Sequence, residues 1–186
     1  MNPTVIISDM VCRHCVAAVE GALERAHVPY EAVEIGKVYL KHPLDDAEKT
    51  ALDAELAPLG FSRVDSDEAA IVEAAKHAVM HHVRDEAECR LKLSACIESQ
   101  LGMSYPAVSR LFSQHEGRTI EKYHQAQKVE RVKELLQQGR RSLDEIADIV
   151  GYSSGAHLSR RFKDVTGMTP SEYVRLQPPR ISLDKV

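Results

Sequence analysis

The sequence predicts an α+β protein in which a small sandwich of strands and helices is followed by a connector helix and an all-helical C-terminal half. Three observations predict this fold class. Short β-branched runs alternate with amphipathic stretches at the N-terminus. A long stretch without Gly or Pro follows them, and one helical segment then occurs twice, fifty residues apart. We expect the domains to cover residues 1–66, 67–92 and 93–186.

The first 66 residues predict the element order βαββαβ. Gly36 separates two short strands, and Gly60 ends the second helix. This order is typical of a split, ferredoxin-like sandwich. The predicted elements are a strand at 4–8, a helix through Val16, Val19, Ala22 and Leu23, strands at 32–35 and 37–40, a helix with Leu52, Leu56 and Leu59 as its buried stripe, and a strand at 61–64.

The connector stretch carries apolar residues at helical spacing over about residues 68–90. These are Ile71, Val72, Ala75, Val79, Met80 and Val83. A connector helix and a dimer contact would each bury this stripe, so a homodimer is an open alternative. We expect His77, His81 and His82 to lie on a solvated helix face, and Cys89 and Cys96 to be small core residues rather than metal ligands.

The charge of the chain is unevenly distributed. The formal net charge is −4. From Ser94 onward there are 14 Lys and Arg against 11 Asp and Glu, or +3, whereas the preceding residues carry 10 against 17, or −7. This asymmetry directs a polyanionic partner to the C-terminal half.

The sequence argues against several functional classes. No run approaches the roughly 18 apolar residues of a membrane span, and the N-terminus lacks a basic segment followed by an apolar one. We therefore expect a cytoplasmic protein without a membrane partner. No hydrolytic triad, phosphate loop or paired-carboxylate site is recognisable, so we do not expect an enzyme.

The C-terminal half contains an internal duplication. Residues 108–123 align with residues 158–173 without a gap. Identical residues occupy six of the paired positions, which indicates two copies of one helical unit. The pairs are Ser109/Ser159, Arg110/Arg160, Phe112/Phe162, Gly117/Gly167, Thr119/Thr169 and Tyr123/Tyr173.

Each copy has the pattern of a helix-turn-helix. In the second copy, Ser142 and Glu145 form a capping box that starts a helix, Gly151 ends it, and a second helix buries Leu158 and Phe162. The second helix of such a unit enters the DNA major groove, where an Arg can bind guanine through two hydrogen bonds. Small residues at Gly155 and Ala156 let the backbone approach the DNA. We expect DNA contacts from Tyr105, Pro106, Ser109 and Arg110 in the first copy and from Gly155, Ala156, Ser159, Arg160 and Lys163 in the second.

This half resembles the AraC/XylS family of bacterial transcription regulators. The resemblance covers about Leu93 to Leu176 and is most specific over residues 142–173. It implies binding to double-stranded promoter DNA, with RNA polymerase as a further partner. A helix over 120–138 would fix the separation of the two copies, and recognition helices about 34 Å apart would enter successive major grooves. Residues 1–92 do not resemble the sugar-binding barrel usual in this family, so the signal has to be argued separately.

The N-terminal domain carries a pair of thiols, Cys12 and Cys15, at the predicted junction of the first strand and first helix. Two thiolates suit Cu(I) or another soft ion such as Hg(II). The helix dipole, together with Arg13 and His14, is expected to lower the thiol pKa values. The sequence offers no obvious further ligands for Zn(II), which prefers four.

Residues 4–64 resemble a heavy-metal-associated (HMA) domain. Met10, Cys12 and Cys15 match its motif, as does the Leu-Gly-Phe sequence at residues 59–61. The resemblance implies that Cys12 and Cys15 are metal ligands and that Met10 packs beneath the loop. The sequence departs from the family at Asp9, where Gly is usual.

Several functions remain open for this pair of domains. The thiols could tune transcription by binding a metal, or they could sense redox state or a small molecule. The domain could also be a degenerate copy retained for dimerisation. Alternatively, the protein traffics metal or senses a thiol ligand, and its helical half binds a partner.

Overall fold

The computed structural model describes residues 3–84 and 92–176. The chain divides into two compact units, residues 1–77 and 78–186. Within the described residues, no helix is both long and apolar enough to cross a membrane. The end of the predicted connector and Cys89 lie outside the described residues, and the predicted domain boundaries stay a prediction.

The first unit contains a four-stranded antiparallel sheet with the strand order β2-β3-β1-β4. The predicted element order βαββαβ is therefore confirmed. In register, Val5 of β1 pairs with Val38 of β3. The elements are β1 (Thr4–Ile7), α1 (Arg13–Arg25), β2 (Tyr30–Glu34), β3 (Lys37–Leu40), α2 (Asp46–Leu56), the 3-10 turn η1 (Ala57–Leu59) and β4 (Arg63–Val64).

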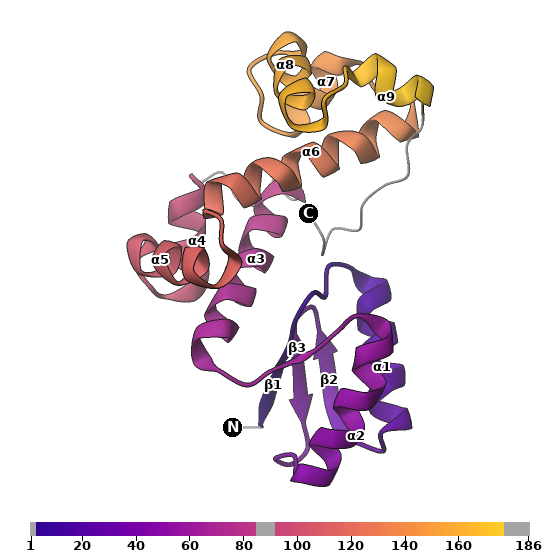
Figure 1. The fold of residues 1–186 in the computed structure, drawn as a ribbon, viewed down its shortest axis with the longest axis vertical. Helices are drawn as coiled ribbons and strands as arrows, with labels where there is room; N and C mark the ends of the chain where they lie inside the picture. Colours follow the sequence, from indigo (N-terminus) through magenta and orange to yellow (C-terminus); the bar gives the residue numbers. More distant parts are fainter. Residues whose placement is uncertain (1–2, 85–91, 177–186) are drawn as a thin grey trace. The chain divides into compact units, whose positions relative to one another are not determined.

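Helices α1 and α2 lie on the same face of this sheet and enclose the core (Figure 1). Asp45 starts α2 through a capping box with Glu48. Leu52 and Leu56 are fully buried, as predicted, but Leu59 is 41% exposed. The prediction for Leu59 is wrong because the chain leaves α-helical geometry at Ala57, and the 3-10 turn rotates Leu59 out of the helical stripe.

Helix α3 (Asp67–Arg84) begins in the first unit and ends in the second. Its predicted stripe is buried, apart from Ile71, which is half-buried. The predicted burial of the stripe is therefore confirmed for most of its residues, and the homodimer stays an open alternative. His81 is exposed as predicted, whereas the prediction for His77 is wrong: its ring packs against the backbone of Gly36, and its Nε2 lies 3.0 Å from the carbonyl oxygen of Met10.

The second unit is helical and is organised around its longest described helix. Figure 1 shows α4 and α5 near the beginning of this helix, α6, and α7, α8 and α9 near its end. Cys96, in α4, is buried as predicted. The helices are α4 (Leu93–Leu101), α5 (Tyr105–Glu116), α6 (Ile120–Gln138), α7 (Leu143–Ile149), α8 (Gly155–Thr166) and α9 (Pro170–Leu176).

The sequence repeat is also a repeat of packing. In the first copy the rings of Phe112 and Tyr123 lie 5.6 Å apart, and in the second the rings of Phe162 and Tyr173 lie 5.5 Å apart. All four residues are buried. Aromatic pairs at such distances stabilise a core beyond the area they bury. In each copy, therefore, an equivalent Phe–Tyr pair packs the second helix of the helix-turn-helix against the helix that follows it.

A pair of histidines lies inside the second unit. The rings of His82 on α3 and His124 on α6 are 5.5 Å apart. His82 Nδ1 and His124 Nε2 are buried, and neither has a hydrogen-bond partner among the described residues. Burial is the largest cause that lowers the pKa of His124, to about 4, and the charge of Lys128 lowers it further.

This histidine pair generates a pH prediction. The folded pKa of His124 lies below its unfolded value of about 6.5, so protonation favours the unfolded state. Its contribution to stability is complete above pH 6.5 and is lost as the pH falls toward about 4. We expect His124→Gln to flatten the pH dependence of urea unfolding in this window. His81→Gln, on the exposed face, should leave the dependence as it is in the wild type, and equal slopes for all three proteins would contradict the assignment.

Candidate nucleic-acid interface and thiol site

The second copy forms a complete helix-turn-helix from α7 to α8. Ser142 starts α7, because its Oγ accepts from the backbone N–H of Glu145 and the Glu145 carboxylate accepts from the backbone N–H of Ser142. Gly151 follows α7 with a φ of 66°, a left-handed conformation that favours glycine. Ser154 then caps α8 by accepting from the N–H of His157. The predicted capping box and glycine turn are confirmed.

Helix α8 has one buried face and one exposed face. Leu158 and Phe162 are buried, as predicted. Ala156, Arg160 and Lys163 are exposed, and Ser159 is half-buried. Arg160 makes no ion pair with any residue that the structure describes. Its guanidinium group therefore retains its donors for an external acceptor, and a guanine edge or a phosphate fits this chemistry.

Gly155 lies at the contact between α7 and α8. It is buried, and its N–H donates to Asp144 Oδ1 at 2.8 Å. A Cβ at this position would lie 2.8 Å from Asp144 Oδ1 and 3.1 Å from Leu143 Cβ. Glycine at this position is therefore also required because α8 begins against α7, and the DNA contact at Gly155 stays a prediction.

The first copy places its predicted contact residues at the start of α5. Pro106 and Arg110 are exposed, while Tyr105 and Ser109 are half-buried. Arg110 occupies the position equivalent to Arg160 and, like it, makes no ion pair within the described residues. The two copies thus present one Arg each, from the same position of the same kind of helix.

Tyr105 is held by the protein itself. Its hydroxyl donates to Glu121 Oε1 at 2.5 Å, and its backbone N–H donates to Glu98 Oε1 at 2.7 Å. Burial raises the pKa of Tyr105 well above its usual range, and the hydrogen bond to Glu121 raises it further. A DNA contact by this hydroxyl would have to replace or share the bond to Glu121.

The prediction omitted His157, which is exposed on α8. It follows Ala156 directly and precedes Arg160 by one helical turn, so it lies on the same exposed face. Its Nδ1 lies 3.1 Å from Ser153 Oγ, and its ring is in edge-to-face contact with Tyr152. Helical spacing alone would have identified it.

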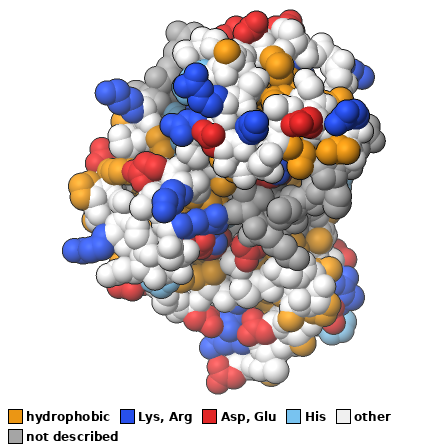
Figure 2. Space-filling view, turned by 45° about the horizontal axis from the view of Figure 1, so that its top comes forward, with side chains coloured by type: hydrophobic (Ala, Val, Ile, Leu, Met, Phe, Trp, Pro, Cys, Tyr) orange, Lys and Arg blue, Asp and Glu red, His pale blue; other side chains and the backbone are white. Residues whose placement is uncertain are grey.

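The surface charge is mixed. Figure 2 shows Lys and Arg side chains standing out from the surface, with Asp and Glu between several of them. On α6, Lys133 is paired with Glu130, and Lys128 lies over the ring of Tyr152. Binding to a polyanion would therefore depend on a few well-placed cations rather than on one continuous basic face.

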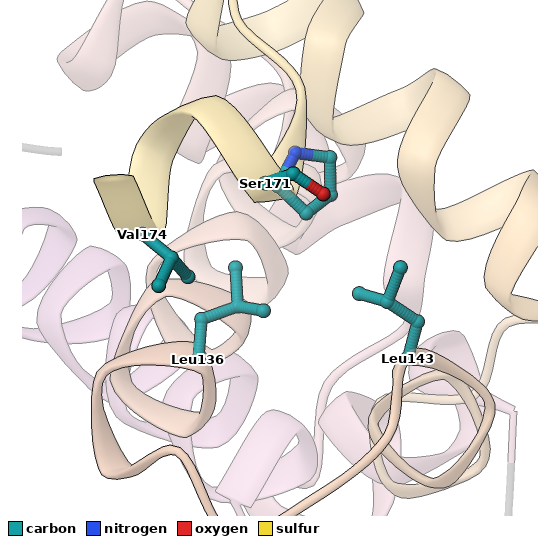
Figure 3. Close-up of a pocket in the computed structure, with 5 residues that line it drawn as sticks. Leu136, Leu143, Ser171 and Val174 are labelled. Atoms are coloured by element: carbon teal, nitrogen blue, oxygen red, sulfur yellow. The ribbon is translucent and has the colours of Figure 1, made fainter. Parts of the chain in front are cut away.

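A shallow apolar hollow of about 290 Å³ lies between α6, α7 and α9. Leu136, Leu143 and Val174 line it, with Ser171 at its edge (Figure 3). Pro170 also lines it, so among the residues that the structure describes here the hydroxyl of Ser171 is the one polar side-chain group. This hollow lacks the convergent acids, bases and nucleophiles of a catalytic site.

Comparisons with known proteins relate the helical half to regulators. Residues 97–176 match the family described as Helix-turn-helix domain. The chain is 29% identical over 136 residues to the xylose operon regulatory protein of Escherichia coli (strain K12). The aligned region covers 72% of this chain and 34% of that protein. The chain therefore spans about a third of the length of the curated relatives it matches.

Two solved structures share the helical fold. One is the C-terminal domain of AraT, a response regulator from Geobacillus stearothermophilus, with a TM-score of 0.52 at 26% identity over 62% of this chain and 92% of that one. The other is a transcriptional regulator from Chromobacterium violaceum, described by its AraC-type DNA-binding domain, with a TM-score of 0.51 at 26% identity over 61% and 96%. Residues 97–176 therefore form a helix-turn-helix domain, and its fold is similar to those of these two regulators. The curated relative and both solved structures are described as regulators.

The thiol site lies apart from the helix-turn-helix domain in sequence, at the junction of β1 and α1. Cys12 is the N-cap residue of α1, and its Sγ lies 3.4 Å from Cys15 Sγ. Both cysteines are half-buried. The preceding loop is anchored by Met10, which is fully buried and whose Sδ accepts from the backbone N–H of Gly36 at 3.3 Å. The position of Met10 beneath the loop agrees with the predicted packing.

The expected lowering of the thiol pKa is not observed at Cys15. Burial, the largest effect, raises its pKa, and the neighbouring Cys12 thiol raises it further, while the Val11 backbone lowers it. The prediction considered the helix dipole and the nearby cations but not burial, which disfavours the thiolate.

Asp9 adopts a φ of 64°, the left-handed conformation in which glycine is favoured. This explains in physical terms why glycine would suit the position.

Replacing Gly155 by Ala is expected to lower the stability of the domain, the opposite of the usual effect of Gly→Ala in a helix. In most helices Gly→Ala raises stability by about 0.5–1 kcal/mol. At Gly155 the added Cβ would meet Asp144 and Leu143, so we expect Gly155→Ala to destabilise the domain by about 1–3 kcal/mol in urea unfolding. Gly21→Ala in α1 is the matched control, because its Cβ would meet only the end of the flexible Arg25 side chain. Stabilisation by both substitutions would contradict the close packing of α7 and α8.

Proposed function

We propose that this protein is a cytoplasmic, sequence-specific DNA-binding transcription regulator whose AraC-type domain binds promoter DNA through α5 and α8. One observation carries the proposal. The two copies expose Arg110 and Arg160 at equivalent helix positions, and neither Arg is paired with a described residue. A single exposed Arg is common on protein surfaces. An Arg at the same position of two helix-turn-helix units is suited to contact two DNA half-sites, one per unit.

We also propose that the first unit is an HMA-like domain that responds to a soft metal ion or to the redox state of its thiols. The βαββαβ order, the antiparallel sheet with β3 and β1 at its centre, and the thiol pair at the junction of β1 and α1 support this assignment. Residues Cys12 and Cys15 would hold the ion. A bound ion would supply a positive charge and a fixed geometry for the loop.

The observed donor set fits a soft ion with few ligands. Metal–thiolate bonds of about 2.3 Å allow two sulfurs on one ion to lie up to about 4.6 Å apart. The observed Sγ–Sγ distance of 3.4 Å is within that span. Among the described residues no group of three or more His, Cys, Asp or Glu side chains is placed to hold an ion, which disfavours a four-ligand Zn(II) site and favours Cu(I) or Hg(II).

The DNA-binding proposal is tested by Arg160→Ala and Arg110→Ala. Loss of a two-hydrogen-bond contact to guanine is expected to cost about 1–3 kcal/mol of specific binding. The protein first selects sequences from a random DNA pool, and the affinity of each variant for a selected sequence and for unrelated DNA is then measured at fixed salt. We expect each variant to weaken binding to the selected sequence far more than binding to unrelated DNA.

Arg175→Ala provides the control for these variants, because Arg175 is an exposed Arg on α9, outside the two predicted recognition helices. It should leave sequence preference unchanged. If no sequence is enriched from the pool, or if the Arg110 and Arg160 variants behave like Arg175→Ala, the regulator proposal fails. In that case a metal-trafficking protein with a partner-binding helical half becomes the better account.

Control by metal is tested separately through Cys12→Ser. We expect Cu(I) to change the affinity of the wild-type protein for the selected DNA, because a bound ion would fix the geometry of the loop that contains both thiols. Cys12→Ser should abolish both Cu(I) binding and this change. Cys96→Ser controls for thiol content, because Cys96 is buried in the helical unit. Equal DNA affinities with and without Cu(I), in wild type and Cys12→Ser alike, would reject metal control.

A further inference from the structure

The loop that precedes the thiol pair is held by α3 at two successive residues. Glu73 Oε2 accepts from the backbone N–H of Asp9 at 3.3 Å. His77 Nε2 lies 3.0 Å from the carbonyl oxygen of Met10, and because a carbonyl oxygen only accepts, Nε2 must carry the hydrogen. Glu73 and His77 are four residues apart, so they lie on one face of α3.

This contact is well buried. Glu73 is only 6% exposed, and its other carboxylate oxygen accepts from Lys76 Nζ at 2.7 Å. Lys76 Nζ also lies 3.8 Å from Asp9 Oδ1. Buried, charge-assisted contacts of this kind hold a geometry more firmly than exposed ones. The conformation of the loop and the position of α3 are therefore linked.

The same loop is fixed from the other side by the β2–β3 turn. The N–H of Gly36 donates to Met10 Sδ, and the ring of His77 lies so close to Gly36 that an added Cβ would be 1.9 Å from His77 Cε1. Three segments therefore meet at Met10: the thiol loop, the strand turn and α3. A movement of the loop cannot be absorbed locally without disturbing one of these contacts.

The link reaches the thiol through one peptide group. The carbonyl of Met10 and the N–H of Val11 belong to the same planar peptide unit, so the hydrogen bond from His77 also constrains the orientation of the Val11 N–H. Val11 directly precedes Cys12 in the chain. His77 therefore constrains the peptide unit next to a proposed metal ligand.

We propose that His77 and Glu73 are positioning residues through which occupation of the Cys12–Cys15 site alters α3. This inference rests on the proposed function, because it takes these cysteines as the site of the signal. An ion shared by both thiolates would replace the direct contact between the two sulfurs at 3.4 Å, so binding is expected to move the loop that α3 holds.

The distal end of α3 has contacts of its own within the second unit. Arg84 donates to Glu134 on α6 at 3.1 Å, and the ring of His82 packs against that of His124, also on α6. Helix α6 connects the two helix-turn-helix copies. Helix α3 therefore contacts the thiol loop within the first unit and α6 within the second.

The test measures hydrogen–deuterium exchange over residues 67–84 of the full-length protein, with and without Cu(I). Cu(I) affinity is measured in parallel by competition with a coloured chelator. We expect Cu(I) to change α3 exchange in the wild type. The change should be lost in His77→Leu, which keeps volume but cannot donate, and retained in His77→Gln, which can donate. His81→Leu, on the exposed face, should respond like the wild type.

The outcomes separate this inference from the function on which it rests. If the wild type binds Cu(I) but α3 exchange does not change, or if His77→Leu responds as the wild type does, the positioning role is refuted while metal binding stands. If the wild type does not bind Cu(I), the metal proposal and this inference both fail. The wild-type experiment can refute the inference without any variant, so a folding defect in His77→Leu does not remove the test.

Discussion

The structure of the helical unit depends on α6, because this one helix completes the core of both copies. Its first residues, Ile120 and Tyr123, are buried, and Tyr123 packs on Phe112 of the first copy. Its later residues, including Val132 and Leu135, belong to the core that contains Phe162 and Tyr173 of the second. A helix rises about 1.5 Å per residue, so the 19 residues of α6 span about 28 Å. The spacing of the two copies is thus a property of a single rigid element.

Much of this architecture could be predicted because it rests on local rules. Capping by Ser142 and Glu145, the left-handed turn at Gly151 and the periodic burial of Leu158 and Phe162 each depend on residues close in sequence. The duplication added a second, independent instance of the same pattern. The order βαββαβ was predictable for the same reason, since strand and helix periodicities differ.

Leu59 is exposed because of a local 3-10 turn, but the other failures of prediction arise from contacts between segments distant in sequence. His77 has the spacing of a solvated face, yet it lies against Met10, 67 residues earlier. The need for glycine at position 155 within the fold could not be predicted either, because the residue that excludes a Cβ there is Asp144 on the preceding helix. The pKa of Cys15 was expected to follow nearby charges, whereas burial by the folded unit raises it. Periodicity identifies a face, but it cannot say what covers that face.

The central claim is that α5 and α8 read one DNA duplex together, from the same side. Hydroxyl-radical footprinting of the full-length protein on a DNA sequence selected from a random pool tests it most directly. We expect two protected stretches whose centres lie about 10 base pairs apart, one helical turn, because α6 fixes the separation of α5 and α8. A single protected stretch, or two stretches offset by about half a turn and so on opposite faces of the duplex, would contradict it.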